Sequence, residues 1–335
     1  MKYGRIDGVS TPISRIVYGT ANPVLFGAFR SVYENAPDFR DRLEAAFALL
    51  DGVFALGVNC FDCADHYGEE PLGEWLESRG LRDRVVILTK GAHHNRWRKR
   101  VTDYDILHDV HNSLAKLKTD RLDLFLLHRD DPSQPVGPIM DALNRCRDEE
   151  KLGVFGVSNW EIPRIEAANE YAAKHNMQPF TVSSPNFGLA EQVCDLWGGG
   201  CVSIAGSENR AAREWYAARH MPVFAYSAMA RGFFSGRVKG DNPDSAAAAM
   251  DEFGIRGYVC PANFERLRRC ERLAAQKGVD VPRIALAWLF NQRALDVYAL
   301  IATTKPENMA VNVAAEALAL TDEECAWLNL ERDAP

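Results

Sequence analysis

The sequence predicts a closed (β/α)8 barrel, an α/β fold, and three observations lead to this fold class. Short apolar runs of β type alternate with helix-length amphipathic stretches along nearly all of the 335 residues. The runs are almost continuously apolar, which is typical of parallel strands that helices cover. They also number eight, as a barrel of this kind requires at this chain length. We therefore expect one barrel domain over residues 1–335.

The first expected strand covers 16–19, where the chain reads Ile-Val-Tyr-Gly, and the later strands are apolar runs of similar length. In chain order they cover 59–62, 85–89, 122–127, 154–158, 180–184, 223–226 and 298–301.

Between these runs lie stretches whose apolar residues recur every three or four positions, as in an amphipathic helix. The expected helices cover 39–56, 71–79, 104–117, 136–150, 162–174, 210–219, 264–277, 282–292 and 305–318. Residues 240–245 and the alanines after them are expected to form one long loop with a helical turn.

An open, doubly wound sheet is the main rival to the barrel. A dinucleotide-binding sheet of that kind carries G-x-G-x-x-G after its first strand, and the sequence lacks this triplet of glycines. It also lacks a Walker A loop, an H-E-x-x-H pair and an EF-hand loop.

Composition excludes several classes of protein. With 47% apolar and 25% charged residues, the chain is neither disordered nor a disulfide-stapled miniprotein. Its net charge of -7 argues against a nucleic-acid partner, and no apolar stretch or leader pattern points to a membrane or to export. We expect a cytoplasmic protein whose eight cysteines are free thiols, with Cys60 and Cys63 in a buried strand.

Polar residues at the ends of the apolar runs are the candidate site, because barrel chemistry lies at the C-terminal ends of the strands. Asp62 ends the second run and Tyr67 follows it. Lys90 ends the third run, and His128 follows the fourth. Each of these residues alone is typical of a helix cap, a solvated lysine or a core residue. Together they bring a carboxylate, a phenol, an ammonium and an imidazole to three successive strands.

This set of groups suits the protonation of a carbonyl oxygen during its reduction by a hydride donor. Lys90, with Asp62 as its counter-ion, is expected to lower the pKa of the Tyr67 phenol. Tyr67 would then donate a proton to a carbonyl oxygen, and His128 would act as a second donor that orients it. No side chain supplies a hydride, so the chemistry implies a nicotinamide coenzyme.

These residues resemble the signature of the aldo-keto reductases, a family of NAD(P)H-dependent (β/α)8-barrel carbonyl reductases. The match lies in Phe61-Asp62-Cys-Ala-Asp-His-Tyr67-Gly68, in Ile-Leu-Thr-Lys90-Gly and in Leu-Leu-His128. The resemblance implies that Asp62, Tyr67, Lys90 and His128 form the catalytic tetrad.

Further segments resemble the family's coenzyme site and imply NADP(H) or NAD(H) as the cofactor. Gly153 to Trp160 is similar to the segment that holds the nicotinamide carboxamide, 226–236 to the loop at the nicotinamide and pyrophosphate, and 303–312 to the adenosine-end segment. The implied coenzyme-binding residues are Gly19, Thr20, Ser158, Asn159, Ser184, Tyr226, Ser227, Arg231, Gly232, Gly236, Thr303, Lys305, Asn308 and Asn312.

Two positions depart from the family pattern. Ser184 stands where a glutamine usually completes the grip on the carboxamide, and its reach is shorter. Asn308 stands where many members have an arginine that pairs with the 2'-phosphate, which leaves Lys305 as the nearby cation. We expect only modest discrimination between NADPH and NADH.

The most basic stretch, 93–100, directly follows Lys90 and should lie at the rim of the site. An inert solvated loop and a substrate contact are both open interpretations, with nucleic-acid binding the weakest. Substrate contacts are assigned to Arg96, Trp97, Arg100 and Trp160, and the substrate is expected to be a small carbonyl compound, with sugar-like aldehydes and ketones among the candidates. No metal site is expected, since the adjacent rings of His93 and His94 diverge.

Two other functions stay open. A metal-dependent barrel isomerase or hydrolase could use His128 with Asp65, Asp130 and Asp131, because hard cations prefer clustered carboxylates. It would leave the lysine and tyrosine of the tetrad without a role. A nicotinamide-binding regulatory barrel could keep the tetrad and yet not turn over.

Overall fold

The computed structural model describes residues 1–335, and eight strands form a closed barrel in the order β10-β3-β4-β5-β6-β7-β8-β9. Every neighbouring pair with an assigned register is parallel. The (β/α)8 fold predicted from the sequence is therefore confirmed. The chain forms two compact units, Met1–Ser184 with Ala302–Asn308 and Pro185–Ile301 with Met309–Pro335.

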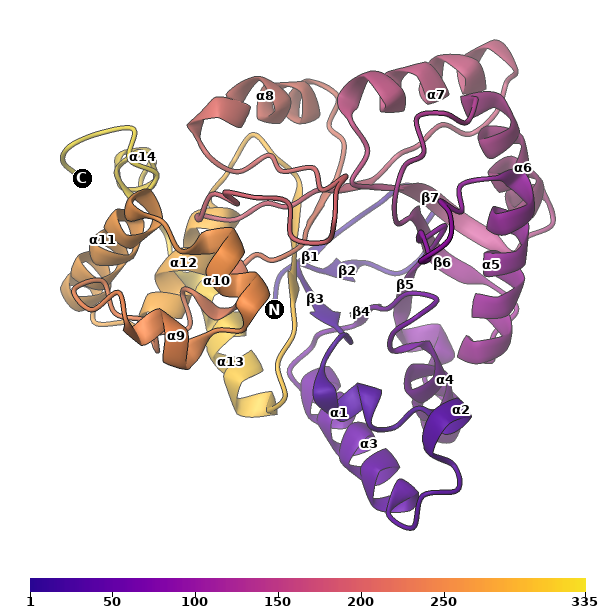
Figure 1. Cartoon of the computed structure of the whole chain (residues 1–335), viewed down its shortest axis with the longest axis horizontal. Helices are drawn as coiled ribbons and strands as arrows, with labels where there is room; N and C mark the ends of the chain where they lie inside the picture. Colours follow the sequence, from indigo (N-terminus) through magenta and orange to yellow (C-terminus); the bar gives the residue numbers. More distant parts are fainter. The chain divides into compact units, whose positions relative to one another are not determined.

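The first unit holds six of the barrel strands and the helices between them (Figure 1). Its strands are β1 (Tyr3–Gly4), β2 (Ile13–Ser14), β3 (Ile16–Gly19), β4 (Cys60–Asp62), β5 (Val86–Gly91), β6 (Leu122–Leu127), β7 (Leu152–Ser158) and β8 (Ser183–Ser184). Its helices are α1 (Pro23–Phe26), α2 (Arg30–Tyr33), α3 (Phe39–Ala55), α4 (Glu69–Arg79), α5 (Asp103–Leu117), α6 (Val136–Asp148) and α7 (Ile162–Lys174).

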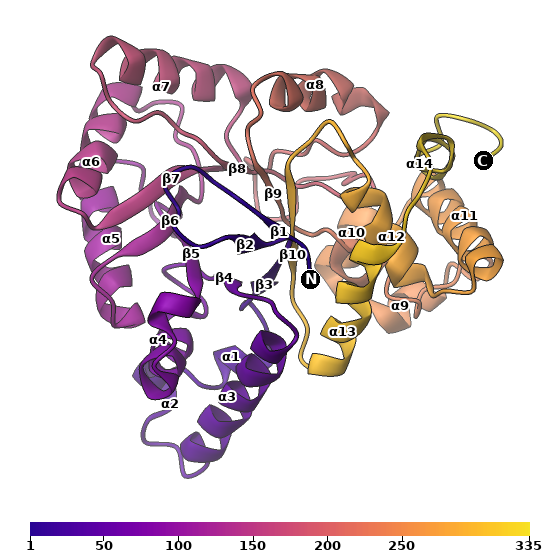
Figure 2. The ribbon, with the colours of Figure 1, turned by 180° about the vertical axis from the view of Figure 1, so that it is seen from behind.

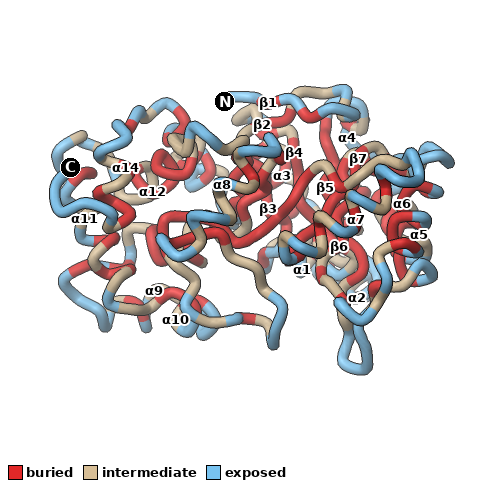
Figure 3. The backbone as a smooth tube through the Cα atoms, turned by 90° about the horizontal axis from the view of Figure 1, so that it is seen from above, coloured by how far each residue is buried: buried red, intermediate tan, exposed pale blue.

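The barrel strands of this unit form a buried inner layer, drawn red in Figure 3. Helices α3 to α7 pack against one another in sequence order outside that layer. The strand residues Phe61, Phe125 and Phe155 have no exposed surface, so the apolar runs bury their side chains as the parallel-sheet pattern requires.

The short antiparallel pair β1–β2 lies across the beginning of the strands in this unit, as Figure 2 shows from behind. Asn59, just before β4, accepts a hydrogen bond from the backbone N–H of Ser14 at 2.8 Å and donates one to the carbonyl of Pro12 at 2.8 Å. A Cβ at Gly8 would lie 2.8 Å from Val154 near the start of β7. This end of the strands is covered, which leaves the opposite end for the site.

The register brings the C-terminal ends of β4, β5 and β6 together. Asp62 pairs with Gly19 of β3 and Leu88 of β5, while Lys90 pairs with Leu126 of β6. The backbone N–H of His128 donates to the carbonyl of Gly91 at 2.8 Å.

The second unit holds β9 (Val223–Ala225) and β10 (Val297–Ile301), which pair in parallel. Its helices are α8 (Arg210–Ala218), α9 (Ser245–Ala249), α10 (Glu252–Tyr258), α11 (Pro261–Lys277), α12 (Val281–Phe290) and α14 (Asp322–Leu328), and α13 (Pro306–Ala314) begins in the first unit. None of the helices in the chain combines the length and apolar character needed to cross a membrane.

All eight predicted strands and all nine predicted helices have a counterpart in the structure, with shifted ends. The strand expected over 180–184 is reduced to Ser183–Ser184, although Thr181 still donates to the carbonyl of Phe155 at 3.3 Å. Helices α1, α2, α10 and α14 were not predicted. The capping box of Thr321 and Glu324 is a sequence signal that could have revealed α14.

The eight cysteines are free thiols, as predicted, and both Cys60 and Cys63 are buried. The single domain predicted for 1–335 stays a prediction beside the division into two units.

Candidate active site

Asp62, Lys90 and Tyr67 form one hydrogen-bonded group at the ends of β4 and β5. The Lys90 Nζ donates to the Asp62 carboxylate and, at 2.8 Å, to the Tyr67 hydroxyl oxygen. The Tyr67 hydroxyl lies 3.3 Å from Asp62 Oδ2, as a long hydrogen-bond donor. Asp62 and Lys90 are only 4% and 3% exposed, so this ion pair is shielded from water.

A tight turn brings Tyr67 back over the end of β4. The backbone N–H groups of Ala64 and Tyr67 each donate to the other's carbonyl at 2.9 Å. Gly68 follows with a φ of +76°, and a Cβ there would lie 1.8 Å from the Thr20 hydroxyl. The glycine after Tyr67 is thus required by both backbone conformation and space.

Burial shifts the pKa values of both Tyr67 and Asp62. Burial and the facing Asp62 charge raise the pKa of Tyr67 well above its ordinary value. The lowering predicted from Lys90 is therefore wrong, because loss of solvent around the phenol and the negative charge of Asp62 both disfavour the phenolate. Burial also raises the pKa of the Asp62 carboxyl, although Lys90 opposes that shift. Tyr67 is therefore protonated at neutral pH, as a proton donor must be.

His128 lies beside Tyr67, with 6.1 Å between the two ring centroids. Burial and the nearby charge of Lys90 lower the pKa of His128 well below its ordinary value, so the imidazole is neutral. Its Nδ1 is buried without a hydrogen-bond partner.

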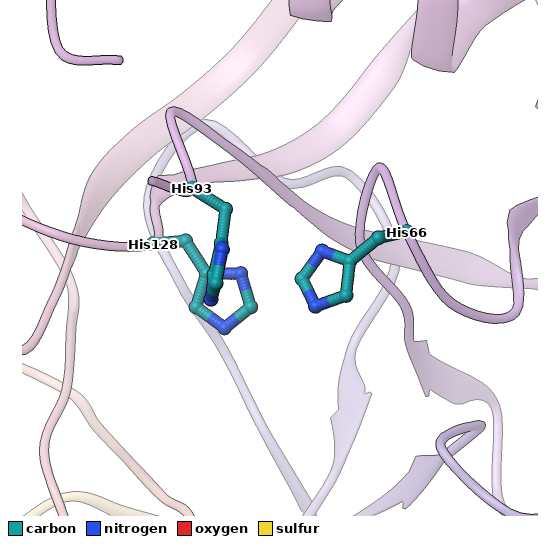
Figure 4. A group of neighbouring side chains, drawn as sticks. All are labelled: His66, His93 and His128. Carbon is teal, nitrogen blue, oxygen red and sulfur yellow. The ribbon is translucent and has the colours of Figure 1, made fainter. Parts of the chain in front are cut away.

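Two further histidines gather around His128, and sequence reasoning did not connect them with it. The rings of His66 and His93 have their centroids 5.3 Å and 4.8 Å from that of His128 (Figure 4). His66 precedes Tyr67, and His93 lies two residues beyond β5. Their positions just after neighbouring strands were the sequence signal that could have predicted their closeness to His128.

Ser158, Asn159 and Ser184, assigned to the nicotinamide carboxamide, lie together at the ends of β7 and β8. The Ser158 hydroxyl donates to the carbonyl of Ser184 at 2.8 Å. The Asn159 amide donates to Ser158 Oγ at 3.1 Å and to the carbonyl of His128 at 3.3 Å. This cluster therefore adjoins the tetrad through the backbone of His128.

Two other segments that were assigned to the coenzyme lie in the first unit. Gly19 ends β3 beside Asp62, and the hydroxyl of Thr20 donates to the carbonyl of Asp62 at 2.8 Å. In the segment after β10, the Thr303 hydroxyl donates to the carbonyl of Lys305 at 3.1 Å. Lys305 and Asn308 are exposed there.

The second unit holds the assigned residues of the 226–236 loop. Ser227, Arg231, Gly232 and Gly236 all have φ between +52° and +93°. Left-handed residues of this kind turn backbone N–H groups into a concave surface that favours anions. Arg231 forms an ion pair with Asp251, and Asn312 is buried.

The basic stretch 93–100 is largely neutralised by carboxylates. The guanidinium of Arg98 donates two bonds of 2.6 Å to Asp105. Arg100 pairs with Asp109 and lies 3.6 Å from Asp65.

Trp97 is 74% exposed, and the Arg96 guanidinium lies 4.1 Å from its ring centroid. Trp160 is 1% exposed, packs on Phe180 and donates its indole N–H to the carbonyl of Arg129 at 3.1 Å. A substrate contact by Trp160 stays a prediction that this packing does not favour.

The carboxylates of the alternative metal-dependent enzyme are already engaged. Asp130 accepts two bonds of 3.0 Å from Arg164, and Asp131 accepts one of 2.8 Å from Ser133. Asp65 accepts one of 2.7 Å from His66. These oxygens do not form a shared cluster for a hard cation.

Comparisons with known proteins point to one family. The model of the Aldo/keto reductase family matches residues 25–329. Aldo-keto reductase YhdN of Bacillus subtilis is 25% identical over 320 residues, which is 91% of this chain and 86% of that protein. Aryl-alcohol dehydrogenase [NADP(+)] of Phanerodontia chrysosporium is 25% identical over 312 residues, covering 85% of this chain and 75% of that protein.

The fold is also that of a solved structure, the glycerol dehydrogenase AKR11B4 from Gluconobacter oxydans. The TM-score is 0.70 at 20% identity, over 97% of this chain and 93% of the other. Because the family model covers most of the sequence, this protein belongs to the aldo/keto reductase family.

Proposed function

We propose that this protein is an NAD(P)H-dependent reductase of aldehydes or ketones in which Tyr67 is the general acid. The observation that carries the proposal is the buried Asp62–Lys90 pair, which holds the half-buried Tyr67 phenol beside a neutral His128. The family generally uses NAD(P)H, and one relative is named as NADP(+)-dependent.

The hydrogen bonds of Tyr67 suit proton donation. Lys90 donates to the hydroxyl oxygen at 2.8 Å, so the hydroxyl proton must point elsewhere. Its bond to Asp62 is long, at 3.3 Å, and can be exchanged for one to a carbonyl oxygen at little cost. Once the proton has moved to that oxygen, the ammonium of Lys90 stabilises the phenolate that remains.

Neutral His128 can donate a second hydrogen bond to the same oxygen. Its Nδ1 has no partner, and its lowered pKa keeps the ring uncharged. A neutral donor orients the carbonyl without placing another full charge beside Lys90.

In each of the two units, the residues assigned to the coenzyme offer groups that suit part of a nicotinamide dinucleotide. Ser158 and Asn159 offer a hydroxyl and an amide for the carboxamide, and the left-handed loop of 226–236 offers backbone N–H groups for a pyrophosphate. When bound, the reduced nicotinamide supplies the hydride to the carbonyl carbon. Lys305 and Asn308 would face the adenosine end, with no arginine for a 2'-phosphate.

A small polar carbonyl compound is the proposed substrate, with sugar-derived aldehydes and ketones among the candidates. The support is the set of three histidines beside Tyr67, which offers hydrogen bonds, together with Arg96 and Trp97 on the exposed loop after β5. Relatives are named for aryl alcohols, so aromatic aldehydes belong in the test.

The experiment is a panel of sugar, aromatic and aliphatic aldehydes and ketones, assayed by nicotinamide absorbance with NADPH and NADH separately. Turnover of at least one carbonyl compound that is lost in Tyr67→Phe is expected. Tight coenzyme binding without turnover on any of the panel would favour the regulatory barrel instead.

A further inference from the structure

The three histidines at the mouth of the site come from three separate segments. His66 lies in the turn after β4, His93 follows β5 and His128 follows β6 (Figure 4). One ligand nitrogen of each ring lies within 4.8 Å of the others. We propose that His66, His93 and His128 bind one divalent transition ion, with Zn²⁺ as its representative.

Two of the rings are already held in the form that binds a metal. His66 Nδ1 bonds to the Asp65 carboxylate at 2.7 Å, and His93 Nδ1 bonds to the carbonyl of His94 at 2.7 Å. An acceptor at Nδ1 places the proton there and leaves the lone pair on Nε2. Metal-binding histidines nearly always donate their other N–H to a carboxylate or a backbone carbonyl in this way.

The third ring supplies an uncommitted nitrogen. Nδ1 of His128 is buried with no hydrogen-bond partner, and a buried polar atom of this kind normally has one. Binding of an ion by Nδ1 of His128 would therefore break no existing hydrogen bond at that atom.

The distances require only a small adjustment. With Zn–N bonds of about 2.0–2.1 Å, tetrahedral ligand nitrogens lie about 3.4 Å apart. The widest separation here, 4.8 Å, must therefore close by roughly 1.4 Å. His66 is the exposed member of the three and has room to move toward the two less exposed rings.

The ligand set selects the class of ion. Imidazole nitrogens suit Zn²⁺, Cu²⁺ and Ni²⁺, whereas Mg²⁺ and Ca²⁺ require oxygen ligands that this cluster lacks. Three histidines leave a fourth position for water or for an oxygen of a ligand. The positive charges of Lys90 and Arg129 near His128 weaken cation binding, and the Asp65 carboxylate opposes them.

Ion binding and carbonyl reduction would share His128. An ion held by this ring would displace the carbonyl from its second hydrogen-bond donor, so Zn²⁺ should inhibit in competition with the carbonyl substrate. This consequence rests on the proposed function, whereas binding of the ion does not.

The primary test is calorimetric titration of Zn²⁺ into chelator-treated protein near neutral pH, with a non-chelating reductant because the eight cysteines are free. We compare wild type with His66→Gln, with the double variant His66→Gln/His93→Gln and with His94→Gln, which keeps the backbone carbonyl that holds His93. One Zn²⁺ per chain is expected, with affinity unchanged in His94→Gln and lost in the double variant.

Asp65→Asn tests the hydrogen bond that holds the His66 ring, and should weaken Zn²⁺ binding about 10- to 100-fold. Co²⁺ substitution should give the absorption of a nitrogen-ligated ion without thiolate charge-transfer bands. The proposal is overturned if wild type binds no Zn²⁺, if the double variant binds it as tightly, or if thiolate bands appear. Binding without inhibition would keep the site and reject only the shared use of His128.

Discussion

Two charged regions of the first unit contain similar residues but serve different purposes. At the ends of β4 and β5, Asp62 and Lys90 are almost fully buried and hold the Tyr67 phenol. In the loop that follows β5, Arg98 and Arg100 reach back from a partly exposed surface to Asp105 and Asp109. The Asp62–Lys90 pair leaves the Tyr67 hydroxyl available for reaction. The ion pairs of Arg98 and Arg100 instead hold the loop in place.

The difference shows that position along a strand carries more information than residue type. A buried ion pair is rarely a good stabiliser, because desolvation offsets much of its attraction. Its persistence at the end of a barrel strand therefore points to chemistry. The loop pairs instead join 98–100 to the start of α5, which is a structural use.

The largest expected effect comes from Tyr67→Phe. The variant should fold and bind coenzyme as wild type does, because only a hydroxyl is removed. Carbonyl reduction should fall by about 10²- to 10⁴-fold, the usual contribution of a general acid. The measurements are kcat on an active carbonyl substrate and coenzyme binding by fluorescence quenching.

Tyr171→Phe is the matched control, since its hydroxyl contacts Asp141 on the surface of the same unit. It should keep full activity. Wild-type turnover in Tyr67→Phe would reject Tyr67 as the proton donor.

The four residues of the tetrad also show how much of the site could be predicted from the sequence. The spacing from Asp62 to Tyr67 and the strand ends at Lys90 and His128 were sufficient to predict their meeting, because parallel strands bring their C-terminal ends to one edge. The direction of the Tyr67 pKa shift could not be predicted, since it depends on burial and on the facing Asp62. The partners of Arg98 and Arg100 depend on loop geometry that no spacing rule fixes.

The same limit explains the histidine cluster. Sequence reasoning weighed His93 with its neighbour His94, and adjacent residues seldom share a ligand. The structure brings His93 instead to His66 and His128, which lie 27 and 35 positions away in the printed numbering. Only strand register and the turn before Tyr67 place those three rings together.

A second prediction sharpens the contrast through stability. Lys90→Met should lower the free energy of unfolding by about 3–5 kcal/mol, because it leaves the Asp62 carboxylate buried without its partner. Urea unfolding of wild type and variant measures the difference. The double variant Asp62→Leu/Lys90→Met should recover much of the loss, and an equally unstable double variant would contradict this explanation.

A third prediction applies the comparison to pH. Asp105→Asn should cost about 1–2 kcal/mol at neutral pH, since the carboxylate of this buried residue accepts two bonds from Arg98 and one from Thr102. Although burial opposes it, the bond from Arg98 lowers the pKa of Asp105. Its stabilisation is thus present above the unfolded-state pKa and lost as pH falls through the folded-state pKa.

The difference in unfolding free energy between wild type and Asp105→Asn should therefore shrink below about pH 3.9, the unfolded-state value for aspartate. Urea titrations across that range provide the measurement. A difference that stays constant down to strongly acidic pH would show that the charge of Asp105 is not what stabilises the loop.

A fourth prediction adds a charge to an exposed segment. Asn308→Arg should shift relative affinity toward NADPH by about tenfold to a hundredfold, through a charge-assisted pair with the 2'-phosphate. Dissociation constants for both coenzymes are measured in wild type and variant. Ala310→Arg, also exposed on α13, adds the same charge elsewhere, and an equal shift there would reject a specific contact.

The smallest expected effect separates the two arginines of the loop that were assigned to substrate. Arg96 lies over Trp97 at the surface, so its charge can reach a ligand, whereas Arg100 is held by Asp109 with Asp65 and Asp105 nearby. Arg96→Ala should lower kcat/KM about two- to fivefold for anionic or polyhydroxylated aldehydes and leave an apolar aldehyde unchanged, the size expected of an exposed charge. Arg100→Ala should reduce thermal stability and affect all substrates alike, because its loss loosens the loop as a whole. The measurement is kcat/KM of wild type and both variants on one anionic, one polyhydroxylated and one apolar aldehyde, at low and moderate salt. If Arg96→Ala lowers all three equally, the loop has no part in recognition, and if Arg100→Ala alone is selective, its carboxylate partners must release it when substrate binds.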